Sequence, residues 1–105
     1  MLHRYPVITP DGRLVIKSFD GPIGLLDVQS VLGGRVDSFT IAGGYVGFVN
    51  ADAGRLGLPQ NSKFPSFSGS VFIAKRDSAG VLTSLTANQH RQINVWVRDS
   101  LPSNS

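Results

Sequence analysis

The chain has 105 residues, enough for one small domain, and carries ten Lys and Arg against seven acidic residues, a formal net charge of +3. Hydrophobic residues make up 41% and charged residues only 16%, which favours a globular fold over a disordered chain. The absence of cysteine excludes a disulfide framework, a thiolate metal site and a cysteine nucleophile.

The beginning of the chain has no apolar core of the kind found in secretory signals, and no apolar run is long enough to span a membrane. We therefore expect a cytoplasmic protein without a membrane partner. The basic residues are scattered in runs of at most two, so the positive charge alone indicates only weak, non-specific association.

The first half of the sequence predicts a hairpin, a helix and a strand. Two β-rich segments, 5–9 and 14–19, flank a turn that contains Pro10 and Gly12. Apolar residues at helical spacing follow over residues 23–32, and the next two residues are the glycines 33–34, which are typical of a helix end. Residues 35–41 alternate as a strand with its larger apolar side chains turned inward.

The second half predicts a hairpin turn at 42–44, a strand over 45–50 and an irregular loop over 55–67. Gly47 inside a strand indicates a bulge or a close backbone approach. The segment 69–76 is too apolar for a strand with one solvated face, so we expect it at the centre of the sheet. A short strand is expected within residues 81–84.

A capping box marks the start of a second helix, with Thr86 as the N-cap and Gln89 three residues later. Ile93, Trp96 and Val97 then form the inward stripe of that helix. The β-branched residues in this stretch lower helix propensity, so a strand over 92–98 is the alternative. Residues 100–105 are expected to form a flexible tail.

Together these elements predict a single α+β domain over residues 1–99. We expect a mainly antiparallel sheet of five to six strands with two short helices on one face of the sheet.

No catalytic constellation is apparent. The two histidines, His3 and His90, have no carboxylates at a spacing that suits a metal site or acid–base chemistry. Asp11, Asp52 and Asp77 fall in glycine-containing turns, where a short carboxylate bonds the backbone. No nucleophile elbow, P-loop or dinucleotide fingerprint occurs. We therefore predict no enzyme activity, no metal and no cofactor, with a small enzyme as the least favoured class.

The loop 55–67 is the best candidate for a binding site, since long irregular loops in compact domains are often binding segments. The predicted binding residues are Asn50, Arg55, Leu58, Pro59, Asn61, Lys63, Phe64 and Phe67. The competing interpretation of the phenylalanines is that a domain this small needs its aromatic residues for the core.

A nucleic-acid or nucleotide binding module is the alternative function. Arg55, Lys63, Lys75 and Arg76 would supply phosphate contacts, and nearby aromatic residues would supply stacking. Homodimerisation through an edge strand is a further expectation, because open sheets leave edges that must be paired or guarded.

The order of these features over residues 5–76 resembles a family of unknown function encoded by phages and bacterial mobile elements. The shared pieces are Pro10-Asp11-Gly12, the helix ending at Gly34, Val49-Asn50, Gly54, Gly57-Leu58-Pro59-Gln60-Asn61 and the strand Gly69 to Ala74. The family usually has an acidic pair before the turn glycine, where this chain has only Asp52.

The resemblance implies a fold and a phage context, and it implies no mechanism. It leads us to expect a small, non-enzymatic phage-type accessory protein that binds and modulates a host protein in the host cytoplasm.

Overall fold

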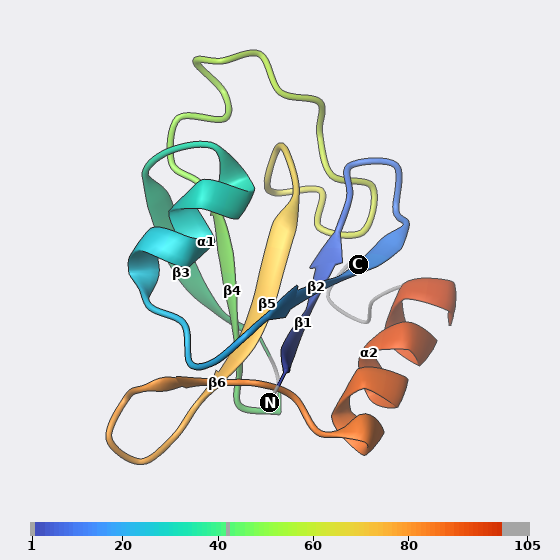
Figure 1. Ribbon diagram of the computed structural model, residues 1–105. Helices are drawn as coiled ribbons and strands as arrows, with labels where there is room; N and C mark the ends of the chain where they lie inside the picture. The colour runs from blue at the N-terminus through green and yellow to red at the C-terminus, as the bar shows by residue number, and fades with distance from the viewer. Residues whose placement is uncertain (1, 42, 100–105) are drawn as a thin grey trace.

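The computed structural model describes residues 2–41 and 43–99, and the predictions for Ala42 and for a tail at 100–105 lie outside the described residues. The chain forms strands and helices in an order close to the one predicted (Figure 1). The elements are β1 (His3–Ile8), β2 (Leu14–Phe19), α1 (Leu25–Leu32), β3 (Val36–Ile41), β4 (Tyr45–Asn50), β5 (Val71–Arg76), β6 (Leu82–Thr83) and α2 (Ala87–Asp99).

The six strands form one sheet in the order β2-β1-β5-β4-β3, with the short β6 paired to the end of β5. Every pairing is antiparallel, which confirms the predicted α+β class and the antiparallel sheet. The segment expected at the centre of the sheet is β5, which lies between β1 and β4. β2 and β3 are the two edges.

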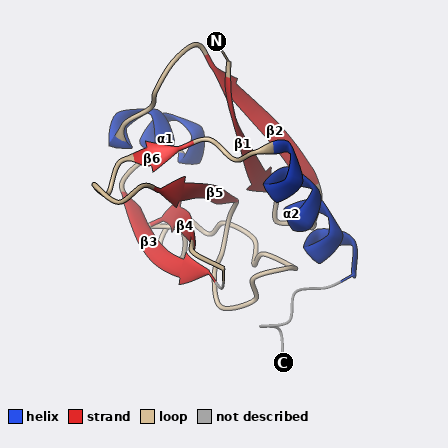
Figure 2. Ribbon diagram, turned by 90° about the horizontal axis from the view of Figure 1, so that it is seen from below, coloured by secondary structure: helices blue, strands red, loops and turns tan. Residues whose placement is uncertain are grey.

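The prediction that both helices lie on one face of the sheet is wrong. Successive β5 residues point to opposite faces, and each face carries its own apolar core. One core lies beneath α2 and contains Ile8, Val71, Ile73, Ile93 and Val97. The other lies beneath α1 and contains Val7, Val28, Leu32, Phe72 and Ala74. Figure 2 shows α1 and α2 on opposite sides of the sheet.

The reason lies in the sequence of β5, whose first four residues, Val71 to Ala74, are all at most 1% exposed. A strand that is apolar on both faces has to be covered on both faces. One helix on each side provides that cover.

The segment 92–98 is helical, as part of α2, and the capping box at its start is formed. The Thr86 amide donates to the Gln89 side chain at 2.8 Å, and the Gln89 amide donates to the Thr86 hydroxyl at 3.2 Å. Ile93 and Val97 are buried while Trp96 is only partly buried, so the predicted inward stripe is confirmed with Trp96 at its margin.

Two glycines are required, Gly33 by the backbone conformation as the sequence suggested and Gly47 by a neighbouring side chain rather than by a bulge or a close backbone approach. Gly33 ends α1 in the left-handed conformation, with φ of 86°. A Cβ atom on Gly47 would lie 2.4 Å from the Phe39 ring on the neighbouring strand, so β4 needs a glycine where the ring crosses it.

Within the described ranges 2–41 and 43–99, no helix combines the length and the apolar character needed to cross a membrane.

Candidate functional site

The longest connection in the fold is the segment 51–70 between β4 and β5, which we call the β4–β5 loop. It projects from one end of the sheet, at the top of Figure 1. Its second half folds back on itself: the Asn61 amide donates to the Phe67 carbonyl at 2.9 Å, and the Gly69 amide donates to the Pro59 carbonyl at 2.7 Å. The loop is therefore closed by its own backbone bonds, as in compact Ω-type loops.

Asn61 fastens this closed loop to the sheet. Its side chain is 0% exposed and uses both ends of the amide. The Nδ2 group donates to the carbonyl oxygens of Ile8 at 3.1 Å and Gly69 at 2.9 Å. The Oδ1 atom accepts from the amides of Lys63 and Phe64, each at 3.0 Å. One buried side chain thus satisfies groups from β1 and from two separate stretches of the loop.

Phe64 and Phe67 anchor the same half of the loop by packing. Phe64 is 7% exposed and belongs to the core beneath α2. Phe67 stacks on Phe39 with ring centres 4.3 Å apart, and Phe64 meets Phe39 edge to face at 5.7 Å. These aromatic side chains fill the core, as the competing interpretation proposed.

Asn50 has a similar task at the other end of the loop. This residue is 5% exposed, and its Nδ2 group donates to the Leu32 carbonyl at the end of α1, at 2.9 Å. Its Oδ1 atom accepts from the Asp52 amide at 2.8 Å. The side chain joins the end of α1 to the first turn of the loop.

Asp52, in the turn that follows β4, is bound by two arginines. Arg35 approaches one carboxylate oxygen at 2.7 Å and the other at 3.3 Å, and Arg55 lies 3.6 Å away. The Arg35 hydrogen bond is the main cause that lowers the pKa of the Asp52 carboxyl, and the same pair raises the pKa of Arg35. Asp52 is ionised and engaged in ion pairs that brace the turn.

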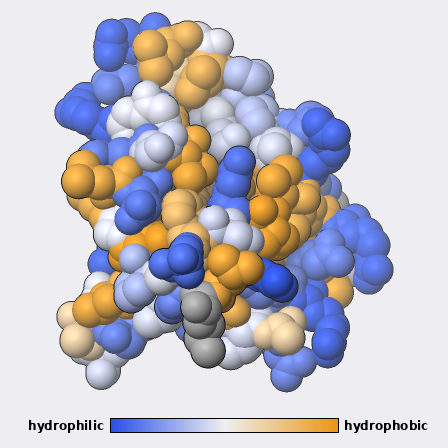
Figure 3. Space-filling model, viewed as in Figure 1, coloured by the Kyte–Doolittle hydropathy of each residue, from blue (hydrophilic) through white to orange (hydrophobic). Residues whose placement is uncertain are grey.

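The first half of the loop faces outward. Arg55 and Pro59 are exposed, Leu56 is 52% exposed, and Leu58 is half-buried over Gly69. We call these four residues the loop tip, and Figure 3 shows hydrophobic side chains at this end of the molecule. Leu56 was not among the predicted site residues. The one feature of the sequence that could have indicated it is its position next to Arg55 in an irregular loop.

The predicted site residues therefore divide into three groups. Asn50, Asn61 and Phe64 lie in the interior, where they hold the loop. Arg55, Leu58 and Pro59 belong to the loop tip, whereas Lys63 and Phe67 are half-buried on the inner part.

The four basic residues of the alternative function are not brought together on one surface. Lys75 lies over the Tyr45 ring at 4.9 Å, and Tyr45 belongs to the core beneath α2. Arg76 lies over the Phe48 ring at 5.8 Å, and Phe48 belongs to the core beneath α1. The two cations therefore point to opposite faces of the sheet, while Arg55 is held beside Asp52.

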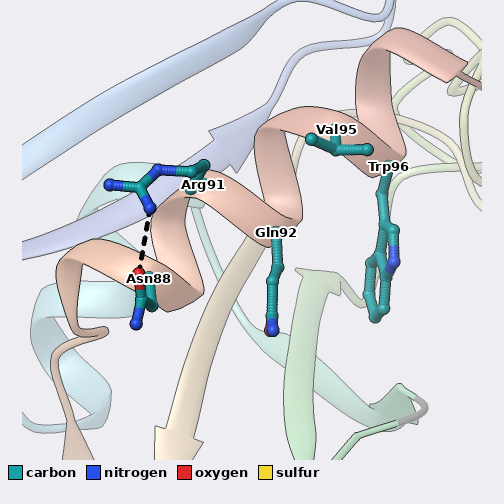
Figure 4. Close-up of a pocket in the computed structure, with 5 residues that line it drawn as sticks. All are labelled: Asn88, Arg91, Gln92, Val95 and Trp96. Carbon is teal, nitrogen blue, oxygen red and sulfur yellow. Dashed lines mark hydrogen bonds between the residues drawn. The ribbon is translucent and has the colours of Figure 1, made fainter.

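A shallow hollow of about 390 Å³ runs along α2 and is lined by Asn88, Arg91, Gln92, Val95 and Trp96. In Figure 4, Arg91 is turned toward Asn88, to which it donates at 3.0 Å, and away from Trp96. Gln92 accepts from the Tyr45 hydroxyl at 2.9 Å, and Trp96 packs edge to face on the Tyr45 ring. The polar groups here satisfy one another and do not converge on a ligand position.

A second hollow, of about 410 Å³, lies where the start of α2 meets β1, between Arg4 and His90 among other residues. Both ring nitrogens of His90 are buried without a hydrogen-bond partner. Burial is the main cause that lowers the pKa of His90. The nearby backbone of Arg4, whose contact with the ring does not have hydrogen-bond geometry, acts in the opposite direction, and the Arg4 charge lowers the pKa further. The lowered pKa favours the neutral form of the His90 ring.

Across residues 2–41 and 43–99, no three His, Cys, Asp or Glu side chains gather in a way that would hold a metal ion.

Comparison with known proteins gave no match: no family model, no curated protein and no solved structure resembles this chain at a significant level.

Proposed function

We propose that this protein is a non-enzymatic binding module whose loop tip, Arg55, Leu56, Leu58 and Pro59, contacts a protein partner. In the phage context that the sequence resemblance implies, the partner is a host protein whose activity the module modulates. The proposal places the protein in the host cytoplasm.

The observation that carries the proposal is the contrast between a fixed base and an exposed tip. The base is held by five hydrogen bonds of the Asn61 side chain, to Ile8, Thr9, Gly69, Lys63 and Phe64. The tip presents Leu56 with half of its surface in solvent. A loop already held in one conformation loses little entropy when a partner binds, so a small apolar contact suffices for affinity.

The chemistry of the tip indicates the kind of partner surface it fits. Leu56 and Pro59 supply an apolar centre, and Arg55, which precedes Leu56 in the chain, has 73% of its side chain exposed. Arginine is one of the residues enriched at interface hot spots. An apolar depression with an acidic rim is the complementary surface.

The test is a pull-down from bacterial lysate with the tagged wild-type chain and with Leu56→Asp, before and after nuclease treatment. A matched control is available in Val81→Asp, because Val81 is 51% exposed in the turn before β6. We expect wild type and Val81→Asp to retain the same protein after nuclease, and Leu56→Asp to lose at least about tenfold of it, since a buried charge would replace an apolar anchor.

If Leu56→Asp retained the same protein as wild type, the loop tip would not be the binding site. Loss of all retained material on nuclease treatment would instead favour the nucleic-acid module. Salt-dependent retention of DNA or RNA by the purified chain would then be expected.

A further inference from the structure

The two edges of the sheet differ in how open they are to another strand. β2 forms one margin and β3 the other (Figure 2). All six residues of β2 pair in unbroken register with β1, and the strand contains no glycine, proline or bulge. Val15 is 38% exposed and Ile16 41% exposed, on opposite faces of the strand. β2 is an unbulged edge with two exposed apolar residues, and its polar residues, Lys17 and Ser18, lie together toward its end; an edge of this kind can pair with another chain.

β3 is better guarded. Its sequence places Asp37, Ser38 and Thr40 among its six residues, and all three are exposed. Its one large aromatic residue, Phe39, is covered by Phe64 and Phe67 of the β4–β5 loop. Polar side chains on an edge disfavour pairing with another strand.

The backbone groups of β2 that face outward follow from one hydrogen bond. The Thr9 amide donates to the Arg13 carbonyl at 2.9 Å, so these opposing residues form a hydrogen-bonded pair just beyond the β1–β2 ladder. Hydrogen-bonded and non-hydrogen-bonded pairs alternate along an antiparallel ladder. Val15, Lys17 and Phe19 therefore bond to β1, whereas Leu14, Ile16 and Ser18 direct their backbone groups away from it.

We propose that two copies of this chain pair through β2, antiparallel and around a two-fold axis that passes beside Ile16. In this register Ile16 lies opposite Ile16 of the second copy, and Leu14 lies opposite Ser18 of the second copy. The outward groups of these residues then make about six backbone hydrogen bonds. The two sheets become one continuous sheet through an isologous contact.

Charge and register select this pairing over its neighbours. A two-fold axis perpendicular to the sheet pairs residues that lie on the same face of the sheet. In any alternative register, the residue of the second copy that lies opposite a given residue therefore changes by two positions. A shift in one direction places Lys17 directly opposite Lys17 of the second copy, where like charges are destabilising. A shift in the other direction places Ser18 opposite a residue that precedes β2 of the second copy. Fewer backbone hydrogen bonds then join the two strands. Centred on Ile16, each Lys17 faces Val15 of the second copy instead.

The pairing does not rest on the function proposed for the loop tip. β2 and the loop tip use different residues, so either proposal stands if the other fails. A dimer presents two loop tips at once, which raises avidity for a partner that carries two sites.

Disulfide trapping tests the pairing directly, because the natural chain contains no cysteine. In Ile16→Cys the two engineered residues are about 5.5 Å apart between Cα atoms, within the range of a disulfide. In Lys17→Cys they are diagonal neighbours at about 7–8 Å, beyond the usual range. Ser38→Cys on the other edge is the matched control. We expect covalent dimer as the main oxidised product for Ile16→Cys alone.

A proline substitution supplies the second measurement. Ile16→Pro removes an outward amide and leaves the β1–β2 ladder intact, since proline is tolerated on an edge where its nitrogen faces solvent. Sedimentation equilibrium is expected to show wild type and Ser38→Pro as dimers and Ile16→Pro as a monomer. Ser38 is the matched position, because the bond from the Ala51 amide to the Arg35 carbonyl makes its backbone groups face outward by the same alternation.

A wild-type chain that sediments as a monomer throughout, with no more disulfide in Ile16→Cys than in Ser38→Cys, would overturn the pairing. Preferential trapping of Lys17→Cys would overturn the register centred on Ile16. Should Ile16→Pro fail to fold, the cysteine variants still decide between these outcomes.

Discussion

Asn61 is a buried polar side chain and His90 is a half-buried one whose ring nitrogens are buried, but the surroundings of their polar atoms are opposite. Asn61, in the β4–β5 loop, has donors and acceptors fully matched by three carbonyls and two amides. His90, in the first turns of α2, has both ring nitrogens buried without partners. Burial of a polar atom costs free energy. Hydrogen bonds offset this cost at Asn61, whereas no hydrogen bond offsets it at His90. A buried polar residue stabilises a fold only through the partners that it satisfies.

Asn61→Ala breaks the first half of this comparison and has the largest expected effect. Removing the amide leaves several buried backbone groups without partners, each worth about 1–3 kcal/mol. Because water will relieve part of that cost, we expect the free energy of unfolding to fall by about 3 kcal/mol. Chemical denaturation of the purified variant measures it.

The matched control for that loss is Asn88→Ala on the exposed side of α2, where we expect a change within about 0.5 kcal/mol. A loss below about 1 kcal/mol for Asn61→Ala would mean that the loop base is held by packing of its phenylalanines rather than by the amide.

His90→Leu sharpens the second half of the comparison and has the opposite sign. An apolar side chain removes two unpartnered buried nitrogens, so we expect a gain of about 1 kcal/mol in the free energy of unfolding at neutral pH. Tyr5→Phe is a parallel test, since the Tyr5 hydroxyl is also buried without a partner. A loss of stability in both variants would show that these polar atoms have partners in solution.

The pH dependence of stability is the smallest expected effect. The pKa of His90 is lower in the folded chain than its usual value of about 6.5, so the unfolded chain binds the proton more tightly. Relative to its value above that usual pKa, the free energy of unfolding therefore decreases as the pH falls through the folded pKa, because the folded chain disfavours protonation of His90. We expect the Tm to fall on acidification from pH about 7.5 to about 5, and to fall less in His90→Leu.

Ending the titration near pH 5 separates this effect from the carboxyls. The pKa values of Asp11 and Asp52 are lowered, by a hydrogen bond from Thr9 and by Arg35 respectively, so their contributions are lost only at lower pH. Equal acid sensitivity in wild type and His90→Leu would refute the assignment to His90.

Local signals in the sequence predicted the elements well, and the spatial relations less well. Turn residues and alternation placed the strands at 14–19 and 45–50 at the bounds that the structure has. The capping box placed the start of α2. The face of the sheet that each helix covers was not predicted correctly. That face depends on β5, which is distant in sequence from α1 and is apolar on both sides.

The candidate site shows the same division. The loop was recognisable from its irregular composition, but its residues could not be sorted into base and tip. Asn61 acts on Ile8, 53 positions earlier in the chain, and no local pattern reveals a contact of that separation. Leu56 was overlooked because exposure is a property of the fold.

The central place of β5 has a consequence for how the chain is assembled. The β1–β2 and β3–β4 hairpins are local in sequence, and either can form soon after its residues leave the ribosome. Within the sheet they are joined by residues 71–76, which lie between β1 and β4. Until that strand is synthesised, the nascent chain holds two separate ribbons with apolar sides open to water. The final third of translation therefore closes the sheet, and interruptions there expose the chain most to aggregation.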